Sequence, residues 1–280
     1  MTETDHVAEA RLLEVTDLNV DYRAKGFRRT PFRALTNVSI SIDRGTTLGL
    51  VGESGSGKTT LGRAILGLVP AESGSIRFEG EEISALSTRH RRRLSRDIGV
   101  VFQDPYSSLN PAMTIEAILA EPLAANGIGR VDASQRVRRL LDSVQLPTDA
   151  GRRLPREFSG GQRQRIAIAR ALALEPKLIV CDEPVSALDL STQSKILELF
   201  IDIQEQTGVS YLFVTHDLAV VRYISHEVAV MLGGAIIETG GGETVTSAPE
   251  HPYTKKLLLA SPVPDPERQA ARRQEYMQLS

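Results

Sequence analysis

The residues from 52 to 59 have types and a spacing suited to binding a phosphate group. They read Gly-Glu-Ser-Gly-Ser-Gly-Lys-Thr. Glycines let a backbone fold tightly enough for its N–H groups to point at phosphate oxygens, Lys58 can reach the β- and γ-phosphates, and Thr59 can offer its hydroxyl to Mg²⁺. The sequence therefore predicts a nucleoside triphosphate site formed by Gly52, Glu53, Ser54, Gly55, Ser56, Gly57, Lys58, Thr59 and Thr60.

The residues on either side have the strand and helix character that such a loop requires. Thr47 to Val51 is a short apolar run of buried-strand type, and Leu61 and Ile65 lie on one face of a following helix. A helix that begins at the loop presents its positive end to the phosphates. The alternative is chance recurrence of four constrained positions, and the strand and helix context argues against it.

Two acidic residues end a second apolar run. Leu178 to Cys181 is followed directly by Asp182 and Glu183. A strand beside a phosphate loop can end in an acid that serves Mg²⁺, and a carboxylate one residue later can polarise the water that attacks the γ-phosphate. We therefore expect Asp182 on the metal side and Glu183 as the catalytic base. The alternative is that both acids only cap a strand end.

A third segment begins a helix with a serine and two glycines. Ser159, Gly160, Gly161 and Gln162 lead into the apolar pattern of residues 166–172. Serine is a strong N-cap residue, and free amides at a helix N-terminus bind anions. With the loop and the acid pair, this segment resembles the signature sequence of the ATP-binding subunits of ABC transporters. The resemblance implies that the segment closes on ATP held by the phosphate loop of a partner subunit.

Further residues match that family in the same order along the chain. The resemblance implies that Gln103 touches Mg²⁺ and links to a membrane subunit, that Asp189 lies in a loop crossing the dimer interface, and that His216 senses the γ-phosphate. Tyr22 lies where the family stacks an aromatic ring on adenine, although Phe27 and Phe32 compete for this role and the ring could merely finish a strand. The implied cofactors are ATP and Mg²⁺, with the metal ligands Thr59, Gln103 and Asp182.

The resemblance runs from about residue 11 to about residue 262 and points to one branch of the family. Residues 102–111 and the tail His251-Pro252-Tyr253-Thr254 look like the oligopeptide, dipeptide and nickel importer branch. Residues 52–63 and 104–106 look more like the F-type than the D-type ATPase of its usual unlike pair. The run Leu232 to Ala235 departs from the branch's usual Tyr-Leu-Gly-Arg and lies outside the nucleotide motifs.

The function implied by the resemblance is ATP hydrolysis that energises uptake of peptides or related solutes through closure of two nucleotide-binding domains. The implied partners are a second, unlike ATPase, two transmembrane permeases, and an external solute-binding protein that acts through the permeases. Nickel chelates, glutathione and oligosaccharides stay open as cargo. A soluble ABC ATPase and an exporter subunit are the other classes. Soluble ABC ATPases usually carry two cassettes or long coiled-coil or zinc insertions, and exporters usually fuse the cassette to membrane helices. This sequence has one cassette and none of these additions, which favours the importer.

Composition fits this interpretation. The chain has 280 residues, 41% of them apolar and 24% charged, with a formal net charge of −2. This balance argues against nucleic acid as a partner, although residues 89–96 are locally basic. No stretch approaches the roughly 18 apolar residues of a membrane helix, and the first residues lack a signal pattern, so we expect a cytoplasmic protein on the inner face of the membrane. The single Cys181 excludes an internal disulfide and an iron-sulfur cluster.

The expected fold class is α/β, that of a P-loop NTPase with an ABC-type nucleotide-binding domain. Residues 46–68, 178–207 and 210–225 should form a parallel core, residues 11–44 and 74–80 an antiparallel β wing of short strands, and residues 104–157 an inserted helical subdomain. We expect a flexible N-terminus over 1–10, the ATPase domain over 11–248 and a C-terminal extension over 249–280.

Overall fold

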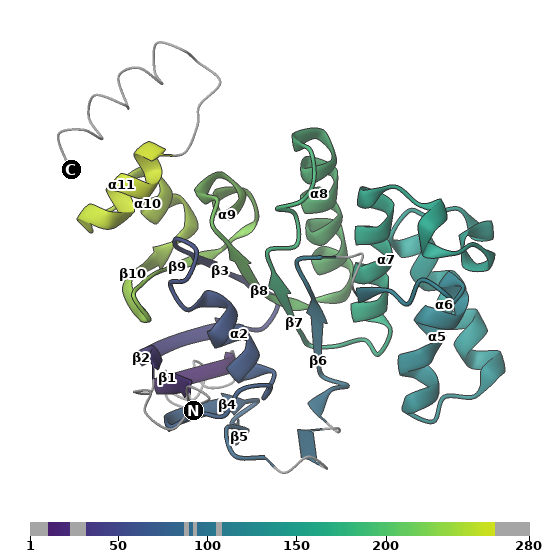
Figure 1. Cartoon of the computed structure of the whole chain (residues 1–280), viewed down its shortest axis with the longest axis horizontal. Helices are drawn as coiled ribbons and strands as arrows, with labels where there is room; N and C mark the ends of the chain where they lie inside the picture. Colours follow the sequence, from purple (N-terminus) through teal and green to yellow (C-terminus); the bar gives the residue numbers. More distant parts are fainter. Residues whose placement is uncertain (1–10, 23–31, 87–89, 92–93, 105–107, 261–280) are drawn as a thin grey trace, which may run out of the picture. The chain divides into compact units, whose positions relative to one another are not determined.

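The computed structural model describes residues 11–22, 32–86, 90–91, 94–104 and 108–260. These residues form two compact units. The first unit contains the chain up to residue 86 and from residue 212 onward, and the second contains residues 87–211. Figure 1 colours the chain along its sequence, so the first unit carries the purple, blue and yellow-green ends and the second the teal middle.

The first unit contains a four-stranded antiparallel sheet with the strand order β2-β1-β4-β5. Its strands are β1 (Arg11–Tyr22), β2 (Phe32–Asp43), β4 (Ser73–Phe78) and β5 (Glu81–Glu82). The first two strands are each 12 residues long, which is longer than the short strands predicted. Their register is irregular near Asp17 and Asn37, both of which have a φ of 47°. Asp and Asn tolerate this left-handed conformation, so the ladder continues past both positions.

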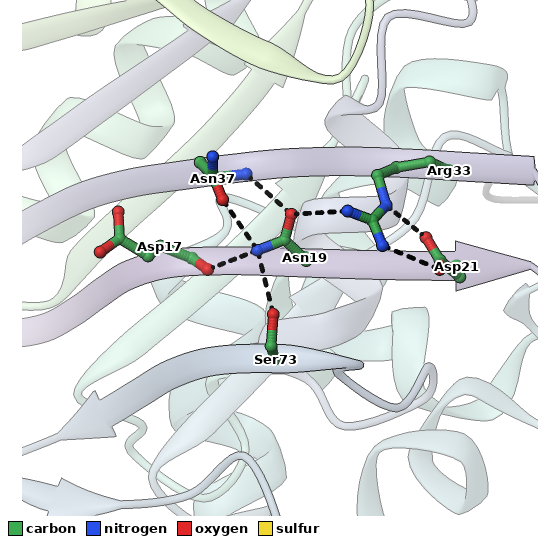
Figure 2. A network of polar contacts seen from close by, with 6 residues as sticks. All are labelled: Asp17, Asn19, Asp21, Arg33, Asn37 and Ser73. Atoms are coloured by element: carbon green, nitrogen blue, oxygen red, sulfur yellow. Dashed lines mark hydrogen bonds and ion pairs between the residues drawn. The ribbon is translucent and has the colours of Figure 1, made fainter.

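A buried amide joins three strands of this sheet, as Figure 2 shows. The side chain of Asn19 on β1 is 7% exposed. Its Nδ2 donates to Asn37 Oδ1 on β2 at 3.0 Å and to Ser73 Oγ on β4 at 3.1 Å, while its Oδ1 accepts from the Asn37 backbone N–H at 3.1 Å. Buried polar groups are costly without partners, so these bonds fix the relative positions of the strands.

The first unit also contains the strand that leads to the phosphate loop and the strands beside it. They are β3 (Thr47–Val51), β9 (Glu227–Leu232), β10 (Ala235–Gly241) and most of β8 (Ser210–Thr215), in the order β10-β9-β3-β8. β3 and β9 are parallel, and β10 is antiparallel to β9. Every residue of β3 is buried, as expected for a strand in the middle of a sheet. The helices of this unit are α2 (Lys58–Ile65), α9 (Leu218–Ile224), α10 (Gly242–Ser247) and α11 (Pro252–Ala260).

The second unit combines two parallel strands with most of the helical residues. β6 (Ile98–Val101) pairs with β7 (Leu178–Asp182), and Val101 lies opposite Cys181. The segment predicted as a helical insertion contains α5 (Ile115–Ala125), α6 (Arg130–Ser143), η1 (Thr148–Arg152) and η2 (Pro155–Glu157). The helices α7 (Gly160–Leu172) and α8 (Leu190–Thr207) flank β7 in sequence.

These elements confirm the predicted fold class, with parallel core strands, an antiparallel wing and helices in the insertion. The domain limits stay a prediction. Several sequence-based expectations lie outside the described residues: those for residues 1–10, for Phe27, for residues 105–106 and for the end of the C-terminal extension, 261–280.

Candidate functional site

The phosphate loop lies between β3 and α2, as the sequence predicted. Gly52 must be glycine here because a Cβ would lie 2.2 Å from the backbone oxygen of Met231 on β9. Gly57 is the N-cap of α2 and has a φ of 110°, a conformation that other residues seldom adopt. On the inner face of α2, Leu61 and Ile65 are buried as predicted. The loop is therefore held between a buried strand and a packed helix.

Lys58 lies inside this loop and is only 4% exposed. Its Nζ donates to the backbone oxygens of Gly52 and Glu53, both at 2.7 Å, and lies 3.5 Å from Ser56 Oγ. A buried ammonium needs such acceptors, because an unsolvated charge without partners is costly. The loop thus concentrates positive charge where the β- and γ-phosphates of a nucleotide would bind.

Tyr22 lies near the start of α2. Its hydroxyl oxygen is 3.4 Å from Thr60 Oγ1, and its side chain is 37% exposed. Phe32, at 65% exposed, is the direct partner of Tyr22 on the neighbouring strand β2. In the adjacent cross-strand pair, Arg33 Nε and Nη2 donate to the two oxygens of the Asp21 carboxylate at 2.8 and 3.1 Å (Figure 2). This ion pair holds the two strands in register where the aromatic rings emerge.

His216 follows β8 directly and is exposed. The neighbouring Thr215 Oγ1 accepts a hydrogen bond from the Asp217 backbone N–H at 3.1 Å, and Asp217 in turn caps α9 by accepting from Ala219 N–H at 2.8 Å. These contacts fix the turn that carries the imidazole. In parallel sheets, ligands bind beyond the carboxyl ends of the strands, which is where this turn lies.

In the second unit the structure brings Gln103 and Glu183 together. Gln103 follows β6, Glu183 follows β7, and the two strands are parallel neighbours. Gln103 Nε2 donates to Glu183 Oε2 at 3.4 Å. Asp182 is the last residue of β7 and is partly buried. The amide and both predicted carboxylates therefore lie at one edge of a sheet.

The backbone of Glu183 is unusual. Its φ is 48°, in the left-handed region that side chains with a Cβ seldom occupy. Ser186 stabilises this turn, because its hydroxyl donates to the Glu183 backbone oxygen at 3.0 Å. Such conformations concentrate at functional sites, where the surroundings enforce them.

The signature segment forms a capped helix start, as predicted. Ser159 Oγ accepts from the Gln162 backbone N–H at 3.3 Å, and Gln162 Oε1 accepts from the Ser159 N–H at 3.0 Å. The two glycines differ in their surroundings. A Cβ on Gly161 would lie 2.4 Å from Thr192 Cγ2 on α8, whereas the nearest atom to a Cβ on Gly160 is 3.8 Å away. Packing explains the glycine at 161 and leaves the one at 160 without a steric reason among the described residues.

Asp189 is the N-cap of α8. Its carboxylate accepts from the Thr192 N–H at 3.0 Å and from the hydroxyls of Thr192 and Ser191, both at 2.8 Å. Hydrogen bonds from the Thr192 backbone and side chain and from Ser191 lower the pKa of Asp189 to about 2. Asp189, which is predicted to lie in the loop crossing the dimer interface, thus has a structural partner within this chain for each carboxylate oxygen.

Oxygen donors of the kind that Mg²⁺ prefers occur at all three predicted ligands, the hydroxyl of Thr59, the amide of Gln103 and the carboxylate of Asp182. Mg²⁺ in nucleotide sites takes only one or two carboxylates from the protein and the rest from phosphates and water. Among the described residues no group of three or more His, Cys, Asp and Glu side chains could hold a metal by itself. The predicted donor set fits a metal bound together with a nucleotide.

Sequence reasoning missed Gly234, which contacts the loop. The Gly234 N–H donates to the Ser56 backbone oxygen at 2.9 Å. Gly233 and Gly234 have φ values of 56° and 85°, and the turn joins Leu232 to its partner Ala235. A Gly-Gly pair between apolar strands signals this hairpin turn, but its position against the loop needs the tertiary structure.

Cys181 is a free, buried thiol. It is fully buried in β7, and burial, with the nearby Asp182 carboxylate, raises the pKa of its thiol well above the usual value. Elsewhere in the described part of the chain, every helix is too short or too polar to cross a bilayer.

Comparison with known proteins gives a consistent set of relatives. A family model described as ABC transporter matches residues 35–186. The chain is 53% identical over 236 residues to the oligopeptide transport ATP-binding protein OppD of Mycobacterium tuberculosis, covering 84% of this chain but 39% of that protein. It is 48% identical over 267 residues to a peptide import ATP-binding protein of Brucella ovis, covering 95% of this chain and 83% of that one.

A solved structure supports the same relationship. The ATP-binding cassette MJ0796, in a dimeric post-hydrolysis state bound to ADP and Pi, superimposes with a TM-score of 0.73 and 29% identity, covering 82% of this chain and 98% of that one.

Proposed function

The chain belongs to the ABC transporter family, and we propose that it is the ATP-hydrolysing subunit of a membrane importer. The observation that carries the proposal is Lys58, an almost fully buried ammonium held by two loop carbonyls at the start of α2. A cationic loop at a helix N-terminus recognises phosphate groups, and the family binds ATP at this motif.

The proposed chemistry assigns a role to each of the predicted site residues. Lys58 binds the β- and γ-phosphates, and Thr59, Gln103 and Asp182 hold Mg²⁺, which when bound neutralises charge on those phosphates. Glu183 orients and deprotonates the attacking water. His216 contacts the γ-phosphate, and the ring of Tyr22 stacks on adenine.

Hydrolysis requires a second subunit in this proposal. Ser159 and the amides of Gly160 and Gly161 form a second anion site, which closes on ATP held by the partner's phosphate loop. The open space at Gly160 supports this role, because packing within the chain does not demand glycine there. The resemblance of residues 52–63 and 104–106 supports the F-type position in an unlike pair of ATPases.

The proposed contact with the membrane subunits includes Gln103 and the residues that follow it in sequence. A surface hollow of about 380 Å³ is lined by Ser108, Asn110, Pro111, Glu121 and Arg170, among others. Arg170 donates to the Ser108 backbone oxygen at 2.8 Å and pairs with Glu121 at 2.9 Å, so the rim of the hollow is fixed. We propose that permease segments dock here, with the chain on the cytoplasmic face of the membrane and an external binding protein delivering the solute.

Peptides are the proposed cargo, supported by the names of the two relatives. Nickel chelates, glutathione and oligosaccharides are the alternatives, since the permeases and the binding protein select the solute. Purified complex, reconstituted in vesicles with both permeases and the second ATPase, should hydrolyse ATP faster when peptide-loaded binding protein is added. Full activity of the isolated chain, indifferent to every membrane partner, would favour a soluble ABC ATPase instead.

Lys58→Ala tests the ATP site directly. Removing the ammonium should abolish tight ATP binding in an equilibrium titration, because charge-assisted bonds to phosphates are lost. Lys195→Ala is the matched control, since Lys195 is an exposed lysine on α8. Unchanged affinity in the Lys58 variant would contradict the phosphate-loop assignment.

A further inference from the structure

The C-terminal helix α11 contacts the phosphate loop through one hydroxyl group. The Glu53 backbone N–H donates to Tyr253 Oη at 2.9 Å, across 200 positions of sequence. Both residues belong to the first unit. Burial raises the pKa of the Tyr253 hydroxyl, so the group stays neutral at physiological pH and acts as a hydrogen-bond acceptor.

Apolar packing holds α11 in place. Tyr253, Leu257 and Leu258 pack against a buried cluster that includes Val51, the last residue before the loop, and Val245 of α10. Figure 1 shows α10 and α11 next to each other at the yellow end of the chain. The ring of Tyr253 is therefore anchored independently of its hydroxyl.

The start of α11 is also held by polar contacts. Glu238 on β10 accepts hydrogen bonds from the N–H groups of Glu250 at 2.7 Å and His251 at 3.2 Å. His251 Nδ1 accepts from the Tyr253 N–H at 3.1 Å. Partial burial alone would raise the pKa of Glu238, but polar contacts with Thr254 and with these two N–H groups lower it on balance. Glu238 is therefore a carboxylate at neutral pH and keeps both bonds.

The hydroxyl contact matters because of the peptide group that it reaches. The Glu53 N–H and the Gly52 carbonyl belong to the same planar peptide unit. Its N–H donates to Tyr253, and its oxygen accepts from Lys58 Nζ at 2.7 Å. One rigid group is thus held from one side by the C-terminal helix and from the other by the lysine that binds phosphate.

We propose that Tyr253 is a positioning residue of the nucleotide site, because it orients the 52–53 peptide group and through it preorganises Lys58 and the loop. This inference rests on the proposed binding of ATP at the loop, and it gives the C-terminal segment a role in nucleotide affinity. Loss of the hydroxyl frees the peptide group to rotate. Nucleotide binding must then restore the order of this peptide group. That entropic cost lowers ATP affinity while the fold is retained.

Tyr253→Phe is the direct test, because it keeps the ring and removes only the oxygen. In the full chain, the dissociation constant for trinitrophenyl-ATP should rise about three- to tenfold, as expected for one neutral hydrogen bond. Affinity for trinitrophenyl-AMP, which lacks the phosphates that Lys58 contacts, should stay the same. Amide hydrogen exchange at Glu53, followed by NMR, should become faster, while the melting temperature changes little.

Two further variants complete the design. Tyr223→Phe removes the same oxygen from a half-exposed ring on α9 and should leave both affinities unchanged. Glu238→Gln replaces one acceptor at the start of α11 by a donor, so it should weaken trinitrophenyl-ATP binding in the same direction.

The outcomes are distinct. Unchanged trinitrophenyl-ATP affinity in Tyr253→Phe overturns the inference. An equal loss of affinity for trinitrophenyl-AMP also overturns it, because general disorder of the binding site would then explain the result. If the wild-type chain does not bind trinitrophenyl-ATP, the proposed function fails. In that case, amide hydrogen exchange at Glu53 that is unchanged in Tyr253→Phe would overturn the positioning role as well.

Discussion

Glu183 shows how a single residue can combine local strain with chemistry. A left-handed backbone conformation is costly for a residue with a Cβ unless its surroundings enforce it. At Glu183 the Ser186 hydroxyl donates to the backbone oxygen, and Gln103 Nε2 donates to the carboxylate. An isosteric substitution tests the catalytic role proposed for Glu183.

Glu183→Gln should retain ATP affinity and lower turnover of the assembled complex by about 100-fold or more, because only the base is lost. Steady-state hydrolysis and an equilibrium titration on the same preparation measure the two effects. Glu198→Gln, at an exposed position of α8, is the control. Turnover near the native rate in the Glu183 variant would show that another group activates the water.

Tyr22 and Phe32 pose a second question at this scale, since both rings are exposed and directly paired. The hydroxyl of Tyr22 reaches the helix that carries Lys58, through its 3.4 Å contact with Thr60 Oγ1. Tyr22→Ala should therefore weaken ATP binding by about 1–3 kcal/mol, the usual contribution of an aromatic ring stacked on a base. Tyr22→Phe should keep most of the affinity, and Phe32→Ala should have the smaller effect. A larger loss for Phe32→Ala in the same titration would assign the adenine contact to β2.

At the scale of elements, the close approach of α7 and α8 depends on Gly161. A Cβ there would lie 2.4 Å from the Thr192 methyl group, and Thr192 is not free to rotate because its hydroxyl bonds Asp189. The start of α7 and the first turn of α8 thus meet at the contact between Gly161 and Thr192.

Gly161→Ala should destabilise the fold by about 1–3 kcal/mol through overpacking. Thr192→Ser removes the opposing methyl group and keeps the hydroxyl, so the double variant should recover most of that loss. Gly160→Ala should be neutral or slightly stabilising, because its Cβ has room. Urea unfolding of the wild type, Gly161→Ala, the double variant and Gly160→Ala measures these differences in stability. Equal destabilisation by alanine at both glycines would refute the packing explanation.

The same scale separates what the sequence could predict from what it could not. The strand before Gly52 and the helix face of Leu61 and Ile65 follow from local periodicity, so they were predictable. The length of β1 was not, because the pattern is interrupted at Asp17, where a bulge carries the ladder onward. The Tyr253 contact was hidden for another reason. Its partner is a backbone N–H 200 positions away, and a backbone group leaves no signature in the side-chain pattern.

At the scale of the whole molecule, the predicted nucleotide residues are divided between the two units. Tyr22, Lys58 and His216 belong to the first unit, while Glu183 and the signature segment belong to the second. In the proposed mechanism the phosphate loop binds one nucleotide, on which Glu183 also acts, while the signature segment acts on the nucleotide held by a partner subunit. The variants that distinguish these roles must leave the phosphate loop intact.

Gly160→Asp should separate the two roles. Its Cβ has space, and a carboxylate in the first turn of a helix is favourable, so the chain should fold normally. The isolated variant should bind ATP as tightly as the wild type, because Lys58 and its loop are unchanged. In the assembled complex the new charge would oppose the triphosphate held by the partner, and hydrolysis should fall about tenfold or more. Gly160→Ala is the matched control for size. Loss of ATP affinity in the isolated Gly160→Asp chain would instead mean that the signature segment acts on the nucleotide bound by its own phosphate loop.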